Sequence, residues 1–140
     1  MFKVLGVDHI GIAVNDLDEV GKFWTEQIGI PCTGKEVVAE QKVETSFNPT
    51  PNGSEIELLA ATEPTSPIAK FIEKNGGRGG IQHIALRVDN IENAIADLMA
   101  KGVKMIDEKP RYGAGGAKIA FIHPKATHGV LLEICEHEDR

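Results

Sequence analysis

The chain has few of the features that define several broad classes of protein. Its two cysteines, Cys32 and Cys135, are far apart and belong to no CxxC motif, which argues against a disulfide framework and against a cysteine zinc site. No apolar run approaches the roughly 20 residues that a membrane-spanning helix needs. The N-terminal segment has no cleavage pattern typical of a signal peptide. We therefore expect a cytoplasmic protein whose cysteines are free thiols.

Positive charge is also scarce. The chain has 15 Lys and Arg against 21 Asp and Glu, and the basic residues are scattered along its length. A nucleic-acid-binding protein would normally gather them into a patch that contacts phosphates. The length of 140 residues is that of one compact domain with its own core. We expect a single domain with no nucleic-acid or membrane partner.

An internal repeat indicates the fold. Residues 7–24 align without a gap with residues 81–98, and residues 43–59 align with residues 119–135. In each copy an apolar alternation precedes an amphipathic helical pattern, and strand patterns separated by Pro and Gly follow it. The sequence predicts an α+β fold of two βαβββ modules, at 1–62 and 79–140, joined by a helical connector at 63–78. Weaker second strands are expected at 31–41 and 103–110.

Strand parity then predicts a metal site. Successive side chains of a strand point to opposite faces, so the apolar positions that pack on each helix leave four polar side chains on the other face. Two of these are histidines at equivalent places of the repeat and two are glutamates at equivalent places: His9, His83, Glu57 and Glu133. Two imidazoles with two carboxylates suit a divalent first-row metal. We expect the two sheets to form one shared cleft that binds this ion.

One further carboxylate stands out because it has no counterpart in the repeat. If Val43, Thr45 and Phe47 face the helix, Glu44 lies in the cleft, whereas the equivalent position in the second copy is Ala120. A carboxylate beside a metal that does not need it as a ligand is suited to proton transfer. Glu44 is therefore the predicted general base, and a solvated edge-strand glutamate is the alternative interpretation.

The remaining charged and imidazole side chains give weaker signals. Four basic residues could meet a carboxylate or phosphates, or could simply be solvated: Arg78, Arg87, Lys118 and Lys125. Three further histidines fall in turns or in the C-terminal tail: His123, His128 and His137. We expect these three to be structural or surface residues, with no role in the metal site.

Three segments together resemble the methylmalonyl-CoA epimerases of the vicinal oxygen chelate superfamily. They are DHIGIAV, SPIAKFIEKNGGRGGIQHIALRVDNI and KIAFIHPKATHGVLLEI, and they extend over most of the chain. The resemblance implies that the metal ligands are His9, Glu57, His83 and Glu133, with Glu57 at a position that is Gln or Glu in that family. It also implies an acid/base pair of Glu44 and Glu133.

The resemblance implies a reaction as well as a site. The substrate would be a CoA thioester, the reaction the interconversion of (R)- and (S)-methylmalonyl-CoA in propionate metabolism, and the assembly a homodimer. No organic cofactor would be needed. The ion would be cobalt first, with nickel, manganese, zinc or iron also compatible with the donor set.

Two other functions use the same ligand types or the same fold. A glyoxalase I-like lactoylglutathione lyase also moves a proton beside a carbonyl group and uses the same four kinds of ligand. A metal-free member of the superfamily that only binds a small molecule is the non-enzymatic alternative. An iron-dependent ring-cleaving dioxygenase would normally present two His and one carboxylate, so Glu57 as a fourth ligand argues against it.

Overall fold

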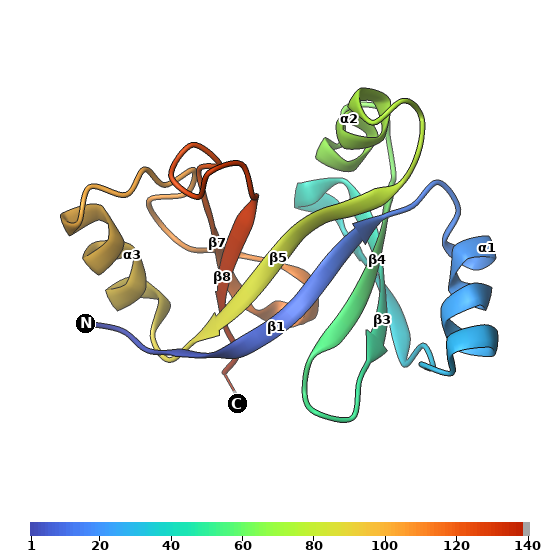
Figure 1. Ribbon diagram of the computed structural model, residues 1–140, viewed down its shortest axis with the longest axis horizontal. Helices are drawn as coiled ribbons and strands as arrows, with labels where there is room; N and C mark the ends of the chain where they lie inside the picture. The colour runs from blue at the N-terminus through green and yellow to red at the C-terminus, as the bar shows by residue number, and fades with distance from the viewer. Residues whose placement is uncertain (139–140) are drawn as a thin grey trace. The chain divides into compact units, whose positions relative to one another are not determined.

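A computed structural model describes residues 1–138 of the chain (Figure 1). In the first half of the sequence the elements are β1 (Val4–Ala13), α1 (Leu17–Lys22), a π-helical turn (Phe23–Ile28), β2 (Gly34–Val38), a 3-10 turn (Ala39–Gln41), β3 (Val43–Pro49), β4 (Glu55–Ala61) and α2 (Pro67–Lys74). In the second half they are β5 (Gly80–Val88), α3 (Ile91–Ala100), β6 (Arg111–Tyr112), a 3-10 turn (Ala114–Gly116), β7 (Lys118–Ile122) and β8 (Leu132–Glu136). This element order confirms the predicted α+β repeat.

The chain folds into two compact units. The first, here called the β4 unit, comprises His9–Gln82, and the second, the β8 unit, comprises Met1–Asp8 together with the chain from His83 onward. The chain therefore passes from one unit to the other between Asp8 and His9, and again between Gln82 and His83. Each passage lies inside a strand, β1 or β5, directly before a histidine of the predicted metal site.

The β4 unit has the strand order β2-β3-β4-β1. Strands β3 and β4 are antiparallel, and β1 and β4 are parallel with Gly11 beside Glu57. Leu58 is fully buried and packs with Val14 and Leu17, so α1 covers the face of β4 that carries Leu58. Figure 1 shows α1 beside β4.

The connector helix α2 covers part of the opposite face. Ser66 caps its N-terminus by accepting a hydrogen bond from the backbone N–H of Ile68, and Pro67 occupies the first turn. Ile68 then packs with Val43 and Leu59, two residues that point away from α1. The helix α2 therefore lies within the range 63–78 of the predicted connector, and it shields one end of the sheet face that carries Glu57.

The β8 unit repeats this plan with the strand order β5-β8-β7-β6. Its helix α3 begins at the N-cap Asn90, whose side chain accepts a hydrogen bond from the N–H of Asn93. One buried cluster joins α3 to the sheet and contains the following apolar side chains: Val88, Ile91, Ala94, Ile95, Met105, Ala120, Ile122 and Ile134. Figure 1 shows α3 on the side of β7 and β8.

The second strand of each repeat is the least regular feature. In the β4 unit β2 falls within the predicted range 31–41, but in the β8 unit the prediction of a strand at 103–110 is wrong. Only Met105 pairs there, in an isolated bridge with Ile122, and β6 follows at Arg111–Tyr112. Pro110 cannot donate a backbone hydrogen bond, so the two-residue ladder of β6 begins directly after it.

Candidate metal centre and acid/base site

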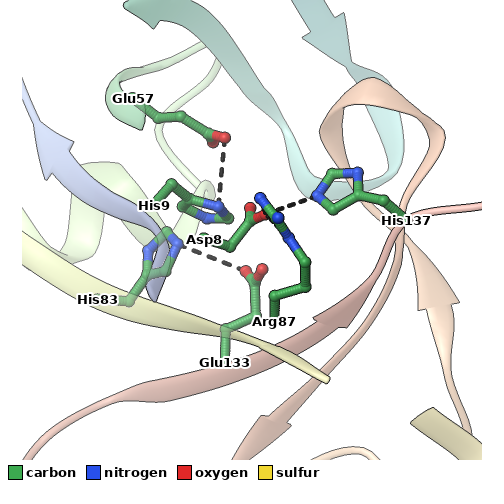
Figure 2. Close-up of polar contacts among 7 residues, drawn as sticks. All are labelled: Asp8, His9, Glu57, His83, Arg87, Glu133 and His137. Atoms are coloured by element: carbon green, nitrogen blue, oxygen red, sulfur yellow. Dashed lines mark hydrogen bonds and ion pairs between the residues drawn. The ribbon is translucent and has the colours of Figure 1, made fainter. Parts of the chain in front are cut away.

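The β4 unit brings His9 and Glu57 together. Gly11 of β1 lies beside Glu57 of β4, and His9 shares the face of Gly11, so both side chains leave the sheet on the same side. The His9 Nδ1 atom lies 3.3 Å from the Glu57 Oε2 atom (Figure 2). Both side chains are buried, at 8% exposure each. The strand register therefore produces the predicted pair.

The β8 unit builds the equivalent pair from His83 and Glu133. Ala85 of β5 lies beside Glu133 of β8, and His83 shares the face of Ala85. The His83 Nε2 atom lies 3.4 Å from the Glu133 Oε1 atom, with both side chains buried (Figure 2). The Phe121 ring meets the His83 ring edge to face at a centroid distance of 5.6 Å, which holds the imidazole from the side.

Each pair has the dimensions of two neighbouring metal ligands. In octahedral coordination with bonds of about 2.1 Å, adjacent ligand atoms lie about 3 Å apart, close to the two N···O distances. Carboxylates as buried as Glu57 and Glu133 are costly to ionise unless a cation or hydrogen-bond donors compensate them. The donors of each unit therefore fit a divalent ion.

The predicted placement of Glu44 is wrong. In the antiparallel register of β3 and β4, Glu44 lies opposite Ala60, whereas Phe47 lies opposite Glu57. Paired residues of adjacent strands point to the same face, so Glu44 points to the face opposite that of Glu57. This is the α1 face: Lys35, whose pKa is raised mainly by a hydrogen bond to Asp18 of α1, also responds to the charge of Glu44.

The parity of β3 was misread because both faces of this strand are covered. Thr45 and Val43 are buried on the side of α2, while Ser46 is buried on the side of α1. Alternation of polar and apolar residues marks a face only when one side meets solvent. The repeat holds the better signal, because the counterpart Ala120 is fully buried in the α3 core and therefore faces a helix.

The structure also assigns partners to two of the basic residues. Arg87 donates from Nε and Nη2 to Asp8 Oδ1, at 3.1 and 3.0 Å, and Lys118 lies 3.2 Å from Glu92 on α3. His137 lies 2.8 Å from Asp8 Oδ1, which agrees with the structural alternative for this histidine. Asp8 was not among the predicted functional residues, although an acid inside an apolar strand is a signal of a paired buried charge.

Comparison with known proteins gives consistent matches. The profile of the Glyoxalase/Bleomycin resistance protein/Dioxygenase superfamily matches residues 8–121. The mitochondrial methylmalonyl-CoA epimerase of Dictyostelium discoideum is 38% identical over 130 residues, which cover 93% of this chain and 77% of that protein. The mitochondrial methylmalonyl-CoA epimerase of Homo sapiens is 36% identical and covers 91% of this chain and 72% of its own.

Solved structures agree with these relatives. A methylmalonyl-CoA epimerase from Mycobacterium tuberculosis has a TM-score of 0.90 and 36% identity, and the match covers 95% of this chain and 88% of that chain. A Streptomyces coelicolor methylmalonyl-CoA epimerase variant in complex with 2-nitronate-propionyl-CoA has a TM-score of 0.89 and 36% identity, with 97% and 99% coverage. The chain therefore belongs to the glyoxalase superfamily and, within it, to the family of the methylmalonyl-CoA epimerases.

Proposed function

We propose that this protein is a metal-dependent methylmalonyl-CoA epimerase that interconverts the (R) and (S) forms of its CoA thioester. The observation that carries the proposal is the buried His–Glu pair built once by each repeat, in a chain that matches epimerases over more than nine-tenths of its length. A solved methylmalonyl-CoA epimerase in complex with methylmalonyl-CoA is 36% identical to this chain. The substrate class therefore agrees with the family.

The proposed ligands of one divalent ion are His9, Glu57, His83 and Glu133. Each unit contributes one nitrogen and one carboxylate to this proposed ligand set. When bound, the ion supplies Lewis acidity that stabilises negative charge on the thioester oxygen. Cobalt is our first choice, and nickel, manganese, zinc and iron also accept two imidazoles with two carboxylates.

Inversion needs two proton carriers, and Glu44 is poorly placed to be one. The α-carbon of the substrate lies between a thioester and a carboxylate. Removal of its proton leaves a planar enolate that can be protonated again on either face. Glu57 lies 3.3 Å from His9 in one unit, and Glu133 lies 3.4 Å from His83 in the other. We propose that one takes the α-proton onto its Oε and that the other delivers a proton to the opposite face.

An aromatic ring lies beside each of these carboxylates in the sheet. Phe47 pairs with Glu57, and Phe121 pairs with Glu133, in both cases on the same face. Apolar rings next to a carboxylate exclude water and weaken the solvation of its charge, which makes the carboxylate a stronger base toward the α-proton of the substrate. The repeat therefore provides each proposed proton carrier with a similar apolar neighbour.

The cellular setting and the assembly are also proposals. No helix within residues 1–138 is long and apolar enough to cross a membrane. We propose a cytoplasmic homodimer, in keeping with the free cysteines and the acidic surface charge.

Two assays on one metal-loaded sample test the function. A single epimer of methylmalonyl-CoA should be converted to a mixture of the (R) and (S) forms, and the hemithioacetal of glutathione should not be isomerised. The second substrate is the relevant rival because a chloroplastic lactoylglutathione lyase of Arabidopsis thaliana is 28% identical over 129 residues. Turnover of the hemithioacetal alone would show a lyase. Absence of both turnover and bound metal would show a protein that only binds a ligand.

A further inference from the structure

A second group of ionisable side chains lies in the β8 unit and has no place in the proposed chemistry. We call it the Asp8 cluster: Asp8, Arg87, Cys135 and His137. The Asp8 side chain is 2% exposed, and its Oδ1 atom accepts hydrogen bonds from Arg87 Nε and Nη2 and lies 2.8 Å from His137 Nε2 (Figure 2). A charge this deeply buried is retained only where its partners are fixed.

Cys135 completes the cluster without being a reactive thiol. It is fully buried and lies beside Arg87 in the β5–β8 register. Burial raises the pKa of the thiol well above its usual range, and the Asp8 carboxylate raises it further. Atoms of Asp8, Cys135 and His137 lie within 4.8 Å of one another, as zinc ligands would. Arg87, however, already places a permanent positive charge on Asp8, which opposes a second cation there.

Three members of the cluster lie on the same three strands that carry proposed metal ligands, β1, β5 and β8. Asp8 is the last residue of β1 in the β8 unit, and His9 follows it directly. Arg87 shares the His83 face of β5, four residues further along, and Cys135 shares the Glu133 face of β8, two residues further along. One buried carboxylate thus joins three strands, each of which carries a proposed ligand.

We propose that Asp8 and Arg87 are positioning residues for the metal ligands, a proposal that depends on the metal site described above. The two-pronged hydrogen bond from Arg87 fixes Asp8, and the peptide that joins Asp8 to His9 transmits this constraint to the imidazole. Lys3 and Asp89 reinforce the arrangement, because Asp89 accepts a hydrogen bond from the Lys3 N–H and donates its own N–H to the Lys3 carbonyl. Loss of the Asp8–Arg87 pair therefore loosens the ligand shell.

Cobalt binding to purified protein tests this inference independently of turnover. Asp8→Asn removes the negative charge with little change in shape, and it should weaken cobalt binding about 10- to 100-fold, as loss of a residue supporting metal ligands does. The visible spectrum of bound cobalt should also change, because the ligand geometry changes. Arg87→Lys retains the positive charge but loses the two hydrogen bonds that the guanidinium donates to Asp8. It should give a smaller decrease in cobalt affinity.

A matched ion pair in the same unit provides the control. Glu92→Gln breaks the exposed contact between Lys118 and α3 and should leave cobalt affinity and spectrum unchanged. If Asp8→Asn proves unstable, Arg87→Lys alone decides the matter. Wild-type affinity and an unaltered spectrum in the folded variants would overturn the proposal. Normal cobalt binding by the wild type without epimerase turnover would instead contradict the proposed function and leave the positioning role testable.

Discussion

The β4 and β8 units support the same His–Glu pair with different amounts of packing. In the β8 unit the ten-residue helix α3 and its sheet share one buried cluster of eight residues. In the β4 unit α1 has six residues and continues into a π-helical turn, Phe23–Ile28, in which no side chain is buried. The N···O distances of the two pairs are nevertheless 3.3 and 3.4 Å. The pair depends on strand register, and the helices contribute mainly stability.

The largest expected effect comes from removing one imidazole. His83→Ala should eliminate both stoichiometric metal and epimerase turnover, because three ligands remain and the β8 unit loses its only proposed nitrogen donor. Metal analysis and turnover are measured on the same sample. His128→Asn is the control: His128 is exposed at φ 63°, a conformation that Asn tolerates, and its replacement should change neither quantity. A full metal content in His83→Ala would exclude this residue as a ligand.

One isoleucine substitution in each unit should sharpen the contrast in packing between the units. Ile134→Ala in the α3 core should lower the free energy of unfolding by about 2–5 kcal/mol, because it leaves a cavity among buried neighbours. Ile28→Ala, at a side chain that is 52% exposed in the β4 unit, should change it by no more than about 0.5 kcal/mol. Urea unfolding curves measure both. Equal losses would show that the β4 unit packs more tightly around its π-helical turn than the burial indicates.

The smallest effects are expected at the two cysteines, one in each unit. Cys32 is exposed and should react with Ellman's reagent in the native protein, whereas Cys135 should react only after denaturation. Raising the pH should leave Cys135 protected, because burial raises its pKa. The double change to Ser should retain metal and turnover. Two rapidly reacting native thiols would contradict the burial of Cys135.

The repeat allowed most of the fold and the four residues of the two His–Glu pairs to be predicted. Its equivalent positions identified the His–Glu pairs, since parity holds wherever a helix covers one face and leaves the other open. The same reasoning misplaced Glu44, because α2 returns to cover the other face of β3 and removes the polarity contrast. The Asp8 cluster was missed for another reason: its members are distant in sequence and become neighbours only through strand pairing.

The strand β6 shows the limit for local patterns. The segment 103–110 has apolar residues at Val103, Met105 and Ile106, yet only Met105 forms a bridge, and β6 is two residues long. A short edge strand gains little from its own side chains, so its position depends on the neighbouring strand and on Pro110. Its boundaries were therefore not accessible from the sequence.

The most direct test of the two-carboxylate account compares Glu57→Gln with Glu44→Gln in deuterated water. Both variants are loaded with cobalt, and each is given one epimer of methylmalonyl-CoA. Glu57→Gln retains a ligand oxygen but loses a proton carrier, so epimerisation should fall by about 10²- to 10⁴-fold. The α-proton of one epimer can still exchange with solvent through Glu133. Glu44→Gln, on the α1 face, should epimerise at nearly the wild-type rate. Normal inversion by Glu57→Gln together with a severe loss in Glu44→Gln would contradict the account.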